Sequence, residues 1–186
     1  MTNTIKYGLG SFLLIFVVYF YNQSSQSSLR SDSIPIYNSD MNQIHRVLIT
    51  ENEKELELVK IDTTWSISKA DSLIIKENNL NNLFDRLLKV EKEMLMSTNI
   101  EKAEKFGVDD SLGRHLKIFD VNDNQIMHYI FGNSGQDYQH NYIREAKSND
   151  IYRTNDNVWW LLNTSPTYWG KKAPKPAEEE PNDENS

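Results

Sequence analysis

The stretch IHRVLITENEKELELVKIDTTWSISK, residues 44–69, sets the expected fold class. In residues 44–51 and 55–62, apolar side chains alternate with polar ones on either side of a short polar segment. Alternation with a period of two is typical of half-buried strands, and the polar segment predicts a hairpin turn. Residues 64–69, centred on Trp65, predict a third strand. Three adjacent strands imply an antiparallel meander.

A second block of strands is predicted further along the chain. Residues 115–121 and 125–131 flank Asn122–Asn124, whose residue types tolerate positive φ and favour a tight reversal. Two more short strands are expected at residues 141–146 and 150–154. The predicted fold class is therefore α+β, with a largely antiparallel sheet in two strand blocks.

Helical periodicity is strongest between the two blocks. Apolar residues recur there with the spacing of an amphipathic helix, which predicts one long helix from about Asn79 to Met96. Its apolar stripe is expected to cover the sheet. A short helix over residues 100–106 is predicted next, with Asn99 as its cap and Gly107 ending it in left-handed conformation.

The N-terminus carries an uncharged apolar run, Tyr7–Tyr21. Its core comprises Phe12, Leu13, Leu14, Ile15, Phe16, Val17, Val18, Tyr19 and Phe20. We expect a single N-terminal transmembrane or signal-anchor helix, because lipid accepts such a run without compensation and the aromatic end suits the bilayer interface. The run is also as short as the apolar part of a signal peptide, so a cleaved signal and a buried globular segment stay open as alternatives.

The charges beside this run predict its orientation and the domain limits. Lys6 precedes it and the next charge is Arg30, so we expect the body outside the cytoplasm, in the periplasm or an equivalent extracytoplasmic space. The expected division of the chain is an anchor or signal (residues 1–21), a polar linker (22–43), an α+β domain (44–170) and a disordered acidic tail (171–186).

Composition excludes several classes of function. Among the 186 residues there is no cysteine, which excludes thiol catalysis, disulfides and cysteine-based zinc sites. Residues 32–172 carry 22 acidic and 17 basic side chains, and this negative body disfavours nucleic acid as a partner. We expect no cofactor, no metal and no catalytic residue. The expected partners are the lipid bilayer and an envelope or membrane protein.

The four histidines, His45, His115, His128 and His140, are candidate general bases or metal ligands. A reversal at Asp123–Asn124 would pair His128 with Phe119 and keep His115 outside a shared coordination sphere. His45 precedes a strand and His140 lies in a predicted loop, and no zinc-binding histidine spacing is present. These histidines are therefore expected to be ordinary surface or strand residues.

Aromatic residues gather near the end of the predicted domain and form the candidate interaction surface: Trp159, Trp160, Tyr168 and Trp169. Exposed indoles would give a stacking platform for sugars or an anchor for a partner protein. The alternative is that the terminal helix packs these side chains onto the sheet.

From Val47 to Trp169 the sequence resembles the bacterial domain of unknown function 4340 family. The resemblance rests on short motifs in a shared order: a strand pair leading to Trp65, an amphipathic helix, Phe106–Gly107–Val108, Ile130–Phe131–Gly132, and Tyr142–Ile143–Arg144 with Ile151–Tyr152. It implies a membrane-tethered or exported accessory protein, linked to ABC-type transport systems. It supplies no catalytic residue.

The expected function is thus a noncatalytic accessory or interaction module of an envelope complex. Two alternatives remain: a module that binds cell-wall or other glycans through the C-terminal aromatics, and a hydrolase with an unrecognised site.

Overall fold

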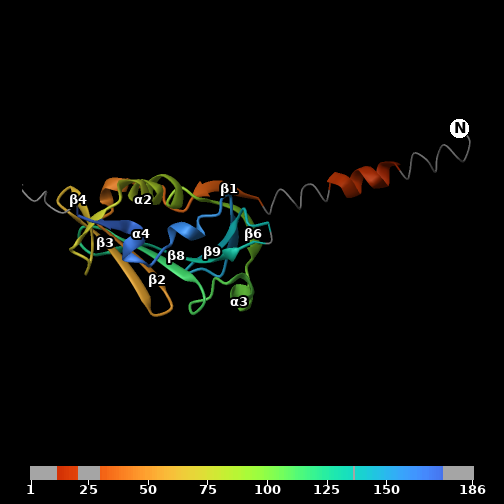
Figure 1. The fold of residues 1–186 in the computed structure, drawn as a ribbon. Coiled ribbons are helices and arrows are strands. Elements are labelled where there is room, and N and C mark those ends of the chain that lie inside the picture. Colours follow the sequence, from red (N-terminus) through yellow and green to blue (C-terminus); the bar gives the residue numbers. More distant parts are fainter. Residues whose placement is uncertain (1–11, 21–29, 136, 174–186) are drawn as a thin grey trace, which may run out of the picture.

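The structure is a computed structural model, and it describes residues 12–20, 30–135 and 137–173 (Figure 1). Its strands are β1 (Arg30–Pro35), β2 (Arg46–Glu51), β3 (Lys54–Ile61), β4 (Thr64–Ile67), β5 (Leu73–Ile75), β6 (Glu91–Ser97), β7 (Arg114–Phe119), β8 (Gln125–Ser134), β9 (Asn141–Glu145), β10 (Ile151–Thr154) and β11 (Gly170–Lys172). The helical segments are η1 (Met41–Gln43), α2 (Glu77–Asn82), η2 (Leu83–Leu87), η3 (Ile100–Lys102), α3 (Ala103–Phe106), η4 (Trp159–Leu161) and α4 (Pro166–Trp169).

Nine strands form one sheet in the order β1-β6-β10-β9-β8-β7-β2-β3-β4, and β5 and β11 form a separate pair. All the strand pairs in both sheets are antiparallel. The two predicted strand blocks meet where β2 pairs with β7, with Val47 opposite Ile118 and Ile49 opposite Leu116. All four side chains are fully buried, because these positions share one face of the pleat. A mostly antiparallel sheet with a few short helices is therefore confirmed.

The hairpin predicted from the opening stretch has the expected strands and a tighter turn. Glu51 pairs with Lys54, so the loop has two residues, and Asn52 adopts a φ of 52°. Two-residue hairpin loops need positive φ, which asparagine tolerates. This register places Ile49 opposite Leu56 in the core.

The prediction of one long helix from Asn79 to Met96 is wrong. Helix α2 continues only through the π-helical turn η2, which ends at Leu87, and the chain then forms strand β6. Strand β6 pairs with β1 on one side and β10 on the other, so tertiary hydrogen bonding overrides the helical periodicity here. Met94, which falls within the range of the predicted helix, lies in the sheet opposite Arg153.

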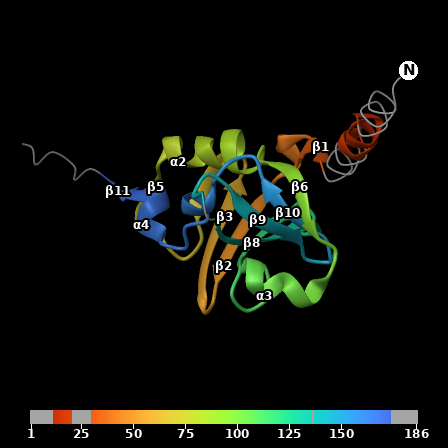
Figure 2. The same ribbon diagram turned by 90° about the vertical axis from the view of Figure 1, so that its right-hand side faces the viewer.

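Helices cover the sheet unequally. Segments α2 and η2 lie over its upper face, where Leu80, Leu83 and Leu87 join the main core (Figures 1 and 2). On the lower face, η3 and α3 cover one end through a smaller cluster that includes Ala103 and Ile130. As predicted, Asn99 caps this short helical segment and Gly107 ends it with a φ of 66°.

Part of the predicted linker, residues 22–43, belongs to the fold. From residue 30 the chain forms β1, which pairs with β6, and the next residues Ile36 and Tyr37 are buried in the main core. Apolar and polar residues alternate only weakly in β1, so the sequence does not reveal this strand. Pairing with the edge of the sheet sets its position. Residues 21–29 and the predicted tail from residue 174 lie outside the described residues.

Candidate functional site

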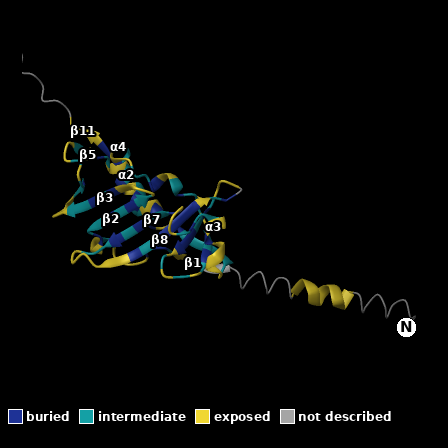
Figure 3. Cartoon of the chain, turned by 90° about the horizontal axis from the view of Figure 1, so that it is seen from below, coloured by how far each residue is buried: buried dark blue, intermediate teal, exposed yellow. Residues whose placement is uncertain are grey.

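The lower face of the central strands is open. Viewed from below, β3, β2, β7 and β8 lie in full view, and their residues are a mixture of buried, half-buried and exposed positions (Figure 3). Strand alternation explains the mixture, because each core residue such as Leu116 is flanked by residues that face the opposite side. The residues on this open side include His115, Lys117 and His128.

His115 and His128 are neighbours on this face. Lys117 pairs with His128 and His115 pairs with Ile130, which places the two histidines diagonally on adjacent strands. His115 Nδ1 lies 2.8 Å from His128 Nε2. The sequence-based pairing of His128 with Phe119, and the separation of the two rings, are therefore wrong.

The turn between β7 and β8 causes this difference in register. The Asp120 carboxylate accepts hydrogen bonds from the backbone amides of Asn122 and Asn124, so the turn begins earlier than the predicted reversal. A bulge then places Phe119 opposite Gln125. A two-residue change of register leaves each side chain on the same face, so the shift moves His128 along β8 to a position next to His115.

The hydrogen bonds define the tautomers of the pair. His115 Nε2 lies 3.1 Å from the Asp110 carbonyl oxygen, which can only accept. In the neutral ring, Nε2–H of His115 therefore donates to Asp110, and Nδ1 accepts from Nε2–H of His128. Burial, together with the nearby His115 and Lys117, lowers the pKa of His128 to about 4.

This lowered pKa predicts acid sensitivity. The unfolded chain binds a proton at His128 near its ordinary pKa of 6.5, whereas the folded chain resists it down to about 4. Stability is therefore lost as the pH falls through this window, by about 1–2 kcal/mol once solvent screening of the half-buried ring is allowed for. Urea unfolding of the natural chain and of His128→Gln at several pH values between 7.5 and 4 measures the loss of stability. The variant should lose less stability on acidification than the natural chain does. His45→Gln is the control, and equal acid losses in all three proteins would contradict the assignment.

Arg144 fixes the loop beside the histidine pair. This side chain is only 4% exposed, and its Nε donates to the Val108 carbonyl at 2.9 Å. Its Nη2 forms a 2.8 Å ion pair with Asp110, and its Nη1 donates to the carbonyls of Ala146 and Ser148. The acidic partner of Arg144 is thus a loop residue, and the arginine holds that loop against the sheet.

The four C-terminal aromatics do not form one exposed platform. Trp169 is fully buried, and its Nε1 donates to the Asn163 carbonyl at 2.6 Å. Trp159 and Tyr168 are half-buried against the main core, and the Arg114 guanidinium lies over the Trp159 ring at 4.1 Å. Trp160 is 42% exposed. Of the candidate interaction surface, Trp160 alone presents a largely free indole.

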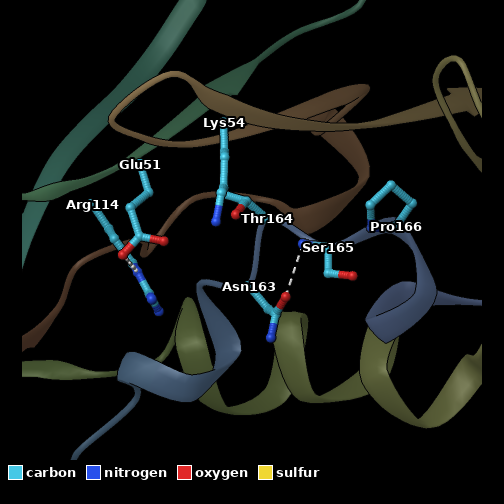
Figure 4. Close-up of a pocket in the computed structure, with 7 residues that line it drawn as sticks. All are labelled: Glu51, Lys54, Arg114, Asn163, Thr164, Ser165 and Pro166. Carbon is cyan, nitrogen blue, oxygen red and sulfur yellow. Dashed lines mark hydrogen bonds and ion pairs between the residues drawn. The ribbon is translucent and has the colours of Figure 1, made fainter.

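A polar cleft lies beside these aromatics. Its volume is about 450 Å³, and it is lined by Glu51, Lys54, Arg114, Asn163, Thr164, Ser165 and Pro166 (Figure 4). The β2–β3 turn forms one wall and the loop between η4 and α4 forms another. Sequence reasoning missed this set, because its members come from three segments that are far apart in the sequence.

The helix of residues 12–20 leaves its apolar side chains in contact with solvent. Their exposed fractions range from 53% for Phe20 to 70% for Phe12. Within the described residues, no helix has the length and apolar character needed to span a membrane. The same part of the chain contains no group of three or more His, Asp or Glu residues that could hold a metal ion.

Residues 65–183 match the family described as Domain of unknown function (DUF4340). The chain belongs to the DUF4340 family. No curated protein and no solved structure matches the chain. The DUF4340 match begins at Trp65 in β4, and the strands that precede it, β1 to β3, complete the same sheet.

Proposed function

We propose that this DUF4340 protein is a membrane-anchored accessory module of a bacterial envelope complex, with its folded body outside the cytoplasm and a role linked to ABC-type transport. The observation that carries the proposal is the helix of residues 12–20, whose apolar side chains all remain more than half exposed. Large exposed apolar surfaces mark interaction with membranes or proteins, and a run of this composition partitions favourably into lipid.

The orientation rests on charge. Lys6 precedes the apolar run, and positive charge is retained on the cytoplasmic side. The body follows on the other side, where its open sheet face and acidic surface are available to a protein partner.

The two alternative functions have less support. Trp169 cannot contribute to a glycan-binding surface, because it is buried in the core. A hydrolase needs a nucleophile positioned by a base. In the described residues, the rings of His115 and His128 hydrogen-bond to each other and to a backbone carbonyl. These hydrogen bonds do not position a nucleophile.

Membrane extraction tests the anchor. The full chain should stay in the membrane pellet after alkaline carbonate washing, and the double variant Leu14→Lys/Val17→Lys should shift to the supernatant. A lysine at the centre of a membrane helix costs about 2.5–3.5 kcal/mol, so two should reduce partitioning more than a hundredfold. Ile61→Lys is the control, because Ile61 is a 62% exposed isoleucine on the body. Recovery of the natural chain in the soluble fraction would contradict the proposal.

The side of the membrane can be tested separately, because the natural chain has no thiol. Asn149→Cys places a single cysteine in an exposed loop of the body. We expect a maleimide reagent that cannot cross membranes to label this variant in intact cells. Labelling only after cell lysis would place the body in the cytoplasm.

A further inference from the structure

We propose that the polar cleft between the β2–β3 turn and residues 163–166 binds a sugar acid, with Lys54 holding its carboxylate. This inference goes beyond the accessory role and does not depend on membrane anchoring. It assigns to the chain a small-molecule site of defined chemistry.

The wall of the cleft around Arg114 is held rigidly. Its Nε donates to Glu51 Oε1 at 2.7 Å and its Nη1 donates to the Trp159 carbonyl at 3.0 Å. The side chain is 18% exposed, and its guanidinium carbon lies over the Trp159 ring, 4.1 Å from the centroid. A guanidinium fixed on three sides keeps the carboxylate of Glu51 in place, so both groups are preorganised for a ligand.

The loop on the opposite side of the cleft is also held rigidly. The Asn163 carbonyl accepts the hydrogen bond from buried Trp169, and the Asn163 side-chain oxygen accepts from the Ser165 amide at 2.8 Å. Ser165 Oγ lies 2.9 Å from Thr167 Oγ1. The loop therefore presents hydroxyl and amide groups from a fixed backbone.

The charges that line the cleft favour an anionic ligand. Arg114 and Glu51 neutralise each other, whereas the Lys54 ammonium has neither an ion pair nor a hydrogen bond among the described residues. Figure 4 shows the Lys54 side chain directed into the gap toward the loop that carries Thr164. One uncompensated positive charge in a body of net negative charge favours a ligand with one negative group. A carboxylate makes a strong, charge-assisted hydrogen bond to an ammonium.

Most of the remaining residues that line the cleft are polar. The hydroxyls of Thr164 and Ser165, the Asn163 amide and the Glu51 carboxylate supply both donors and acceptors to the cleft. Sugar hydroxyls, which both donate and accept, match this pattern, whereas an apolar ligand would leave these groups unpaired. A volume of about 450 Å³ accommodates a single sugar residue.

Calorimetric titration of the full chain with glucuronate and galacturonate tests the proposal, with glucose as the neutral probe. We expect saturable binding of at least one sugar acid, and no saturable binding of glucose. Lys54→Gln should weaken binding about tenfold or more, since it removes the charge-assisted bond. Ser165→Ala should weaken it about threefold.

Lys60→Gln is the matched control, because it removes the same charge further along β3 and outside the cleft. It should bind as the natural chain does, and circular dichroism should show that all variants are folded. Three results would overturn the proposal: no saturable binding of either sugar acid at millimolar concentration, equal binding of glucose, or equal affinity in folded Lys54→Gln.

Discussion

Replacing Trp169 with alanine is expected to lower the free energy of unfolding by about 3–5 kcal/mol, the usual cost of emptying a tryptophan site in a core. Trp169 is fully buried in the main cluster, and its indole N–H holds the Asn163 carbonyl. Alanine would leave both a cavity and an unpaired carbonyl. Urea unfolding followed by circular dichroism gives the measurement.

Trp160→Ala is the matched control. Trp160 belongs to the same aromatic group, yet it is 42% exposed and has a guanidinium 5.4 Å from its ring. We expect a change of less than about 1 kcal/mol, since an exposed cation–π contact contributes little. Similar losses in the two variants would show that Trp169 is not the core residue described above. Because Trp169 supports the 163–166 loop, its variant should also lose any ligand of the cleft.

The second large effect is expected at Arg144. Arg144→Met keeps much of the side-chain volume but removes every donor, and it should lower the free energy of unfolding by about 3–5 kcal/mol, because a buried carbonyl left without a donor costs about 1–3 kcal/mol. The carbonyls of Val108, Ala146 and Ser148 would be left without the arginine, whereas the Asp110 carboxylate is 81% exposed and stays solvated. Thermal and urea unfolding measure the loss.

A surface arginine serves as the control for this change. Arg86 forms two hydrogen bonds with Asp156, at 2.6 and 2.9 Å, but its side chain is 44% exposed. Solvent-exposed ion pairs contribute about 1 kcal/mol or less. Arg86→Met should therefore destabilise the protein much less than Arg144→Met. A smaller effect at Arg144 than at Arg86 would contradict the role assigned to the buried residue.

Sequence patterns correctly predicted the turns, helix ends and strands that depend on neighbouring residues. The hairpin of β2 and β3 follows from alternation around a turn that Asn52 can adopt. Gly107 ended its helix as predicted, since glycine accepts positive φ without strain. Strands β7 to β10 also lie where alternation placed them.

The elements that sequence reasoning missed depend on distant partners. Residues Glu91–Ser97 form a strand because β1 and β10 offer hydrogen bonds on both sides, which periodicity cannot reveal. The short strands β5 and β11 exist only as a pair, joined between Ile75 and Gly170. Neither segment is long enough to show a pattern of its own.

The candidate site was less predictable than the fold. The contact between His115 and His128 depends on a bulge and on the capping of one turn by Asp120, and a change of register by two residues would separate the rings. The cleft around Lys54 depends on how the loop of residues 163–166 returns to the β2–β3 turn. The spacing of residues along the sequence does not reveal which distant segments meet in the fold.

The position of β2 limits how this protein can be divided. Strand β2 lies between β7 and β3, although it precedes the stretch that matches the DUF4340 family. A fragment that began at Trp65 would expose the backbone of β7 along its whole edge and leave β4 with nothing to pair with. Bare strand edges recruit other chains, so such a fragment would self-associate. An autonomous folding unit must therefore include the chain from Arg46, where β2 begins, onward.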